Sequence, residues 1–302
     1  MSLFSAVEMA PRDPILGLNE QFAADTAPVK VNLGVGVYFN DQGKLPLLEC
    51  VQQAEHTMML KPAARGYLPI DGIAAYDTAV KGLVFGADSE AVKSNRVSTV
   101  QALGGTGGLK IGADFLKKLN PAAKVMISDP SWENHRALFS AAGFAVDSYA
   151  YYDEQNRGIN FEGLIKSLSA AAAGTVVVLH ACCHNPTGAD LSDAQWVQII
   201  DVVTQRGLVP FLDMAYHGLG EDLDRDAASV RLIAKAVPEL LIAVSCSKNF
   251  GIYRERTGLL AVLCHGSAQA GVVTGHLGRA ERQLRPRSRH GAGVRRQAQP
   301  DP

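Results

Sequence analysis

From about residue 95 onward, short apolar runs alternate along the chain with segments whose apolar residues recur at helical intervals. The run at 175–180 (TVVVLH) is nearly all apolar, which is typical of a strand that is covered on both faces of a parallel sheet. Strands that alternate with helices in this way predict an α/β fold with a mainly parallel sheet and helices on both faces. The predicted strands lie at 124–128, 175–180, 208–213, 240–245 and 259–264.

The helical segments between these strands carry start and stop signals. Ser192 is followed three residues later by Gln195, which is the spacing of a capping box. Gly207 suits the left-handed conformation that ends a helix. Two further helices are predicted, one ending near Ala142 and one over 227–236.

Both ends of the chain depart from this pattern. The first 45 residues are predicted to form an irregular arm and short strands in a separate substructure. After Gly278 the alternation stops, and residues 279–302 have almost no β-branched residues and no amphipathic period. Such a composition predicts a disordered tail, with a nucleic-acid-binding arm as the alternative.

Length and composition narrow the class of protein. A chain of 302 residues suits about two domains, and 47% hydrophobic with 20% charged residues is ordinary for a globular protein. These values exclude an extended disordered chain, a collagen-like repeat and a small disulfide-stapled scaffold. The five cysteines form no regular framework, no secretory signal opens the chain, and no apolar run reaches the roughly 18 residues of a membrane helix. We therefore expect a soluble, cytoplasmic protein that has no membrane partner.

The formal net charge of −1 is unevenly distributed along the chain. The segment 279–302 holds seven arginines against two acidic residues, a net of +5, which leaves −6 on the rest of the chain. A mildly acidic body suits an enzyme that acts on small molecules, and it argues against nucleic acid as the main partner.

Candidate catalytic residues follow the predicted strands, where open α/β sheets bind their ligands. Lys248 comes just after a strand, among hydroxyl residues, and partial burial there lowers a lysine pKa so that the amine can form a Schiff base. Arg256, together with Ser245 and Ser247, suits a phosphate dianion. The alternatives are a plain surface lysine and an ion pair between Arg256 and a neighbour such as Glu255.

Two other strand ends carry polar side chains. Asp213 can hold a ring nitrogen in its protonated form, and Tyr216 can donate a hydrogen bond to a phenolate oxygen. Helix capping is the alternative for Asp213. Asn185, held extended before Pro186, has a side-chain amide that is free to donate to a ligand.

A glycine-rich turn and an aromatic residue complete the set. Gly104, Gly105 and Thr106 stand in the run GGTGG at the start of a predicted helix, where free backbone N–H groups can bind an anion. The spacing is neither that of a P-loop nor that of a dinucleotide fingerprint. Trp132 can stack on a ring, with ordinary packing as the alternative.

The group Cys182, Cys183 and His184 raises the question of a metal site. No second Cys or His pair stands at ligand spacing, so the sequence predicts no metal.

Taken together, these residues supply an amine for a Schiff base, a phosphate site, a carboxylate for a ring nitrogen, donors for a phenolic oxygen and a stacking aromatic. Those are the groups needed to hold pyridoxal 5'-phosphate (PLP), and few other ligands need all of them. PLP is therefore the expected cofactor.

The order and amino-acid sequences of these motifs resemble those of the class I aminotransferases of the aspartate and aromatic-amino-acid type, which have PLP fold type I. The resemblance covers roughly residues 5–265, with a modest lean toward the bacterial tyrosine-type enzymes. It implies a homodimer that transaminates aromatic amino acids, aspartate or both, with 2-oxoglutarate as the 2-oxo acid. The segments that carry it are NLGVGVY, YLPIDG, GGTGG, SDPSWENH, HACCHNPTG, LDMAYHG and SCSKNFGIYRERTG.

The resemblance also implies roles for individual residues. Lys248 would form the Schiff base and Asp213 would pair with the pyridine nitrogen, supported by His135. The implied catalytic residues are Lys248, Asp213 and Tyr216. The implied cofactor-binding residues are Gly104, Gly105, Thr106, Trp132, Asn185, Asp213, Tyr216, Ser245, Ser247, Lys248 and Arg256, with Tyr67 reaching the phosphate of the other subunit. Gly36, Trp132 and Asn185 would contact the substrate.

The expected domains follow from the same resemblance: an N-terminal arm (1–15), the N-terminal part of a small domain (16–47), a large PLP-binding domain (48–278) and the arginine-rich tail (279–302). Family members continue past position 302 into the rest of the small domain, which holds arginines that bind substrate carboxylates. The change of composition after Gly278 suggests a truncated or frame-shifted gene. The alternative function is therefore a catalytically impaired remnant that keeps the PLP pocket. Another PLP enzyme of this fold and a nicotinamide dehydrogenase are more distant alternatives.

Overall fold

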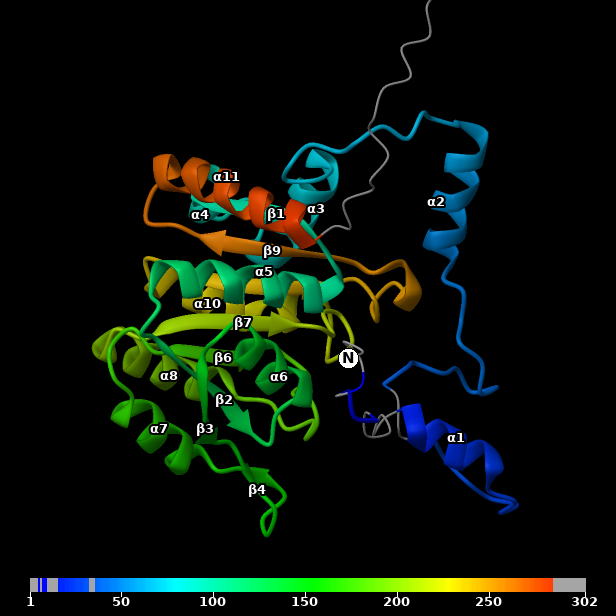
Figure 1. Ribbon diagram of the computed structural model, residues 1–302, viewed down its shortest axis with the longest axis horizontal. Coiled ribbons are helices and arrows are strands. Elements are labelled where there is room, and N and C mark those ends of the chain that lie inside the picture. The colour runs from blue at the N-terminus through cyan, green and yellow to red at the C-terminus, as the bar shows by residue number, and fades with distance from the viewer. Residues whose placement is uncertain (1–4, 6, 10–15, 33–35, 285–302) are drawn as a thin grey trace, which may run out of the picture. The chain divides into compact units, whose positions relative to one another are not determined.

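The computed structural model describes residues 5, 7–9, 16–32 and 36–284 (Figure 1). The chain forms two compact units, Met1–Ala54 and Glu55–Pro302. Helix α1 (Leu16–Ala24) lies in the first unit, and helix α2 (Glu49–Leu60) begins there and ends in the second. The sequence pattern predicted neither helix.

The short strands predicted within the first 45 residues are absent from the described part of that segment, so this prediction is wrong for those residues. A turn stands there instead. The Asn40 side chain accepts hydrogen bonds from the backbone N–H groups of Gln42 and Lys44, and the Asn40 carbonyl accepts from Gly43. An asparagine that bonds the backbone just ahead of it favours a turn over an extended strand.

A seven-stranded sheet forms the centre of the second unit. The two strands that flank β9 run antiparallel to it, and every other neighbouring pair is parallel, which confirms the mainly parallel sheet. Five of the seven observed strands match the predicted runs to within a few residues, whereas the sequence pattern did not predict the strands at 97–103 and 145–150. In spatial order the seven observed strands are β1 (Val97–Leu103), β9 (Thr257–Leu263), β8 (Leu240–Ser245), β7 (Val209–Met214), β6 (Val176–His180), β2 (Lys124–Asp129) and β3 (Ala145–Ala150).

Helices cover both faces of this sheet (Figure 1). In strand β6, Val176 and Val178 pack on one face, whereas Val177 and Leu179 pack on the other. All four side chains are buried, as predicted for a strand covered on both sides. The first face carries α5 (Gly104–Leu119), α6 (Glu133–Ala141) and α11 (Ser267–Leu284), and the second carries α3 (Ala74–Phe85), α7 (Phe161–Ala170), α8 (Asp193–Arg206) and α10 (Ala228–Ala236).

The start and stop signals that the sequence predicted for α8 are both present in the structure. Ser192 Oγ accepts from the Gln195 backbone N–H, and the Gln195 side chain accepts from the Ser192 N–H, so the capping box is closed. Gly207 has φ 62° and ends the helix in the left-handed conformation.

Short elements connect the main ones. A two-stranded hairpin, β4 with β5, follows β3, and the single-turn helix η1 precedes β9. The bounds of these elements are α4 (Glu90–Lys93), β4 (Tyr152–Asp153), β5 (Gly158–Ile159), α9 (Leu223–Asp226) and η1 (Tyr253–Glu255).

Helix α5 lies unusually close to the sheet because of its glycines. A Cβ on Gly112 would stand 2.5 Å from Phe211 Cζ, and one on Gly108 would stand 2.8 Å from the Leu259 carbonyl oxygen. Side chains at these positions would push the helix off the strands. The glycine-rich run therefore sets the distance between α5 and β7 to β9 as well as opening the helix.

Helix α11 runs to Leu284, six residues past the point at which the sequence pattern predicted the end of regular structure. The rest of the tail, 285–302, lies outside the described residues. Within the part of the chain that the structure describes, no helix is long and apolar enough to cross a membrane.

Candidate active site

A pocket of about 220 Å³ opens at the carboxyl ends of β6, β7 and β8, beside the start of α5. Ligands bind at this edge in open α/β sheets. Ten residues that the sequence analysis assigned to a cofactor site line it: Gly105, Thr106, Trp132, Asn185, Asp213, Tyr216, Ser245, Ser247, Lys248 and Arg256. Leu109, His180 and Ala215 complete the lining.

Lys248 follows β8 and is half-buried in the pocket wall. Its Nζ lies 4.7 Å from the centre of the Tyr216 ring. Burial lowers the pKa of the amine; the Asp213 carboxylate works against this, and the Arg256 guanidinium adds to it. An amine in this setting loses its proton more readily than an exposed lysine, as the sequence analysis expected for a nucleophile.

Asp213 lies within β7 and is buried. The helix-capping alternative is therefore wrong, because no helix begins at this residue. Asp213 Oδ2 is 2.9 Å from His135 Nε2, which matches the supporting position that the resemblance implied for His135. Burial alone would raise the pKa of Asp213, but the hydrogen bond from His135, together with the favourable electrostatics of neighbouring side chains such as Lys248, lowers it overall.

Arg256 lies at the other end of the pocket, with a φ of 53° in the left-handed region. Its Nη1 donates to Ser247 Oγ at 3.2 Å and to the Tyr253 carbonyl at 3.0 Å. The alternative ion pair with Glu255 is wrong, because Glu255 pairs with Arg254 at 2.9 Å. The Arg256 guanidinium is thus held beside Ser247 in the pocket lining.

The start of α5 completes this end of the pocket. Gly104 has φ +68°, and a Cβ there would stand 2.7 Å from Arg256 Nη2. A Cβ on Gly105 would come within 3.1 Å of Ser245 Cβ. The glycines keep open a cradle bordered by a guanidinium, hydroxyls and the first N–H groups of a helix, a donor set that fits a phosphate group.

Tyr216 and Trp132 both line the pocket. Burial, and secondarily the Asp213 charge, raises the pKa of the Tyr216 phenol, so the group stays protonated and can donate a hydrogen bond. The Trp132 ring meets the His135 ring edge-on, with the centroids 5.2 Å apart. Trp132 therefore packs on His135 and also borders the pocket, and its stacking on a bound ring stays a prediction.

His180 is a pocket residue that the sequence analysis missed. It pairs in register with Asp213 across β6 and β7, and its ring centroid is 5.1 Å from that of His135. Its Nε2 is buried and has no hydrogen-bond partner among the residues that the structure describes. Burial lowers its pKa to about 4, so the ring is neutral. The available signal was its place as the last residue of the apolar run at 175–180.

Three of the predicted site residues do not line this pocket. Gly104 stands next to it, against Arg256. Tyr67 is 98% exposed, and its role was assigned to the other subunit's site. Gly36 belongs to the first unit, and its role as a substrate contact stays a prediction.

Comparison with known proteins places the chain in a family. The family "Aminotransferase class I and II" matches residues 28–300, so the match extends past residue 265 and into the arginine-rich segment. The chain belongs to this family, and it is an aminotransferase of the aspartate and aromatic-amino-acid group.

Individual relatives support the same grouping. The aspartate aminotransferase of Pseudomonas aeruginosa is 56% identical over 282 residues, which are 93% of this chain and 71% of the relative. The aromatic-amino-acid aminotransferase of Escherichia coli is 46% identical over 276 residues, covering 91% of this chain and 70% of that protein.

The solved structures agree. The aromatic-amino-acid aminotransferase of Burkholderia pseudomallei, covalently bound to pyridoxal phosphate, superposes with a TM-score of 0.92 at 59% identity. The superposition covers 94% of this chain and 71% of that protein. This chain therefore shares the fold of the PLP-dependent aminotransferases over about seven-tenths of their length.

Proposed function

We propose that this protein transfers amino groups between aspartate or aromatic amino acids and a 2-oxo acid such as 2-oxoglutarate, with PLP bound in the pocket described above. One observation carries the proposal. A lysine amine of lowered pKa shares a single pocket with a buried carboxylate at one end and an arginine–serine–glycine cradle at the other.

The residues present fit the cofactor. The cradle formed by Gly104, Gly105, Ser247 and Arg256 offers space and donors to its phosphate. At the other end, the Asp213 carboxylate suits the protonated ring nitrogen. The Asn185 amide and the Tyr216 hydroxyl suit the ring oxygen, and Trp132 suits the face of the ring.

When bound, PLP supplies an electron sink that stabilises the negative charge left at the substrate Cα after proton removal. The protein's own groups do the rest. The Lys248 amine would hold the cofactor covalently and, as a free amine, would carry a proton from the substrate Cα to the cofactor carbon. Asp213, kept anionic by His135, would hold a proton on the ring nitrogen of the bound cofactor.

We further propose that the active form is a homodimer in the cytoplasm. Tyr67 is almost fully exposed, and it stands in the segment YLPIDG that resembles the family motif. A large exposed tyrosine suits a role in the partner's site, where it would reach the cofactor phosphate. All five cysteines are free thiols, in keeping with a reducing compartment.

Two experiments on the full 302-residue chain test the proposal. Reduction with sodium borohydride in the presence of PLP, followed by peptide mapping, is expected to place one pyridoxyl group on Lys248. An exchange assay with aspartate or an aromatic amino acid and 2-oxoglutarate is expected to yield glutamate. A label elsewhere, or none, overturns the cofactor assignment. Labelling without amino transfer supports the impaired remnant that the sequence left as the alternative.

A further inference from the structure

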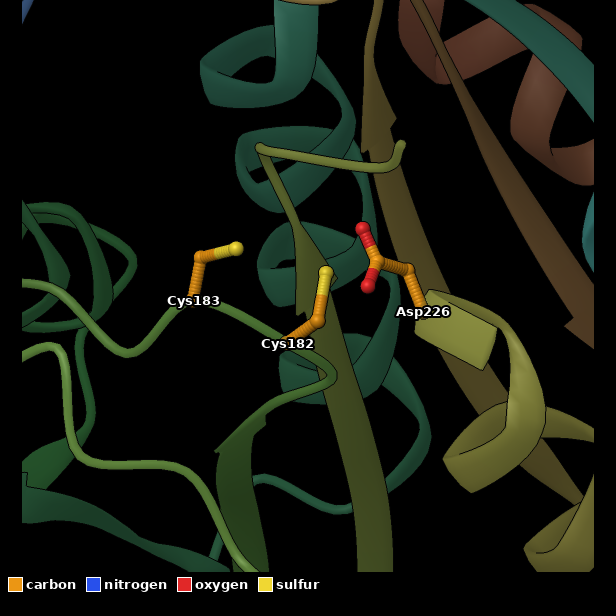
Figure 2. A group of neighbouring side chains, drawn as sticks. All are labelled: Cys182, Cys183 and Asp226. Atoms are coloured by element: carbon orange, nitrogen blue, oxygen red, sulfur yellow. The ribbon is translucent and has the colours of Figure 1, made fainter. Parts of the chain in front are cut away.

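Three side chains that the proposed aminotransferase chemistry does not use point toward one another (Figure 2). Cys182 and Cys183 follow β6, and Asp226 is the last residue of α9. The two Sγ atoms and a carboxylate oxygen of Asp226 all lie within 4.8 Å of one another. We propose that this Cys182–Cys183–Asp226 cluster is a binding site for one thiophilic divalent cation of the zinc and cadmium class.

The carboxylate in the cluster is already fixed in orientation. Asp226 Oδ2 accepts from the backbone N–H groups of Gly218 and Gly220, at 2.8 and 2.9 Å. Oδ1 accepts from only one, that of Glu221, at 3.0 Å. Since each carboxylate oxygen offers about two lone pairs, Oδ1 keeps one for a further partner. Hydrogen bonds of this kind hold carboxylate ligands in place around metal ions.

Space for a cation is kept open by Gly220. A Cβ at this residue would stand 2.6 Å from Asp226 Oδ1 and 3.2 Å from Cys183 Sγ, between the two ligand atoms. The backbone of Gly220 is not left-handed, so its conformation alone does not demand glycine. The missing side chain instead leaves a gap that borders both the free lone pair of Oδ1 and the sulfur.

The ligand atoms select the class of cation. In a tetrahedral zinc site with Zn–S near 2.3 Å, two sulfurs stand about 3.8 Å apart, so atoms within 4.8 Å need move only slightly to close on an ion. Two sulfur ligands favour zinc or cadmium over calcium or magnesium, which prefer oxygen. Each thiol that binds releases its proton to the solvent, and the fourth position stays open for water.

The sequence analysis predicted no metal because it required a second Cys or His pair at ligand spacing. The structure supplies the third ligand as a carboxylate on a separate helix, which linear spacing does not reveal. The site would also lie on the loop that carries Asn185, two residues beyond Cys183.

Cadmium alone is the sharpest probe, because cadmium–thiolate bonds absorb in the ultraviolet. Titration of the full chain is expected to give one cadmium per chain, with that absorbance, by equilibrium dialysis. Cys182→Ser and Cys183→Ser are each expected to weaken binding at least about 10-fold, and Asp226→Asn by about 10-fold. Cys50→Ser removes an exposed thiol outside the cluster and is expected to leave binding unchanged.

Two results would overturn the site: cadmium binding that survives in the Cys182→Ser/Cys183→Ser double variant, or binding that is lost in Cys50→Ser. If a serine variant fails to fold, Gly220→Ala, which fills the gap and keeps all three ligands, provides the second test. It is expected to lower cadmium affinity, and unchanged affinity in a folded Gly220→Ala protein also contradicts the proposal. None of these readouts depends on PLP or on enzyme activity.

Discussion

His135 Nε2 lies 2.9 Å from Asp213 Oδ2, and both side chains are almost completely closed off from solvent. On the other side of the ring, Ser131 Oγ lies 2.9 Å from His135 Nδ1. Because an ionised carboxylate only accepts hydrogen bonds, this chain of contacts puts the His135 proton on Nε2 and leaves Nδ1 to accept from the serine hydroxyl. Asp213 is thereby kept as an anion in a buried position, where a lone carboxyl group would take up a proton.

Replacement of Asp213 tests the role of this charge. Asp213→Asn keeps the size of the side chain and removes its charge, so the ring nitrogen of the cofactor loses its partner. Since breaking a buried pair costs about 3–5 kcal/mol, kcat for amino transfer is expected to fall about 10²- to 10⁴-fold. Asp114→Asn, on α5 outside the pocket lining, is the matched control. An Asp213→Asn enzyme within threefold of the parent would show that the charge is not needed.

Lys248 is expected to be indispensable for turnover but not for cofactor binding. In Lys248→Ala the phosphate cradle and Asp213 are intact, so PLP still binds, although without a covalent bond. Loss of both the nucleophile and the proton carrier is expected to lower kcat at least about 10³-fold. Steady-state rates and a PLP-binding titration measure the two effects separately.

Lys110→Ala is the control for this substitution, because Lys110 is ion-paired with Asp114 on α5 and does not line the pocket. Its rates are expected to match those of the parent. Retained amino transfer by Lys248→Ala would contradict the assignment of the proton carrier.

Arg256→Lys separates the shape of the guanidinium from its charge. The lysine keeps the positive charge but cannot donate to Ser247 and to an anion through a planar fork. Hydrogen bonds to charged groups contribute about 1.5–3 kcal/mol, so the Kd for PLP is expected to rise about 10- to 100-fold. Arg254→Lys, which alters the exposed partner of Glu255, is expected to leave the Kd unchanged. Equal PLP affinity in both variants would remove Arg256 from the phosphate site.

The sequence predicted five of the seven strands of the sheet and most of the pocket lining because both depend on local patterns. Strand β6 reads as an unbroken apolar run, and the residues that follow β7 and β8 gather at one edge because parallel strands end together. His180 was missed because the sequence pattern singled out residues that follow a strand, whereas His180 is the last residue of β6 itself. Its importance comes from its pairing with Asp213 on the neighbouring strand, and the register between two strands cannot be deduced from the sequence of either strand alone.

The helix α1 and the end of α11 were missed for a different reason. Both lie where the chain lacks a clear apolar period, and the arginines after Gly278 favoured disorder in the sequence pattern. In the structure, Val273 and Leu277 of α11 are buried against the same core as α5, so packing on the sheet sets the helix. Tertiary contacts of this kind outweigh local propensity.

Gly112→Ala tests the close packing of α5 on the sheet. The added methyl group would meet Phe211 at 2.5 Å, and overpacking of this kind is expected to lower the free energy of unfolding by about 1–3 kcal/mol. Gly271→Ala, in open space on α11, has no such contact and is expected to stabilise the protein by up to about 1 kcal/mol. Urea unfolding of the two variants measures the contrast. A stable Gly112→Ala protein would mean that α5 does not lie this close to β7.

Asp77 introduces a pH dependence of stability that is independent of the active site. It is buried on α3, and its Oδ1 has no hydrogen-bond partner among the residues described by the structure. Burial is the main cause that raises its pKa to about 7. The charge of Asp71 adds to this rise, and the charge of Lys81 opposes it. The folded protein therefore holds a proton that the unfolded chain releases near pH 4, so the contribution of Asp77 to stability is greatest below pH 4 and is lost as the pH rises through 7.

Asp77→Asn removes this titration. The variant is expected to be more stable than the parent at pH 8 by about 1–2 kcal/mol, and no more stable at pH 4. The value at pH 8 is smaller than the full rise of the Asp77 pKa would give, because solvent screens part of the interaction. Urea unfolding at both pH values measures the difference. Asp88→Asn removes a fully exposed carboxylate that pairs with Lys93, and it is expected to leave the slope between pH 5 and 8 unchanged. If Asp77→Asn shifts stability equally at both pH values, the aspartate is ionised throughout and its burial does not control the proton.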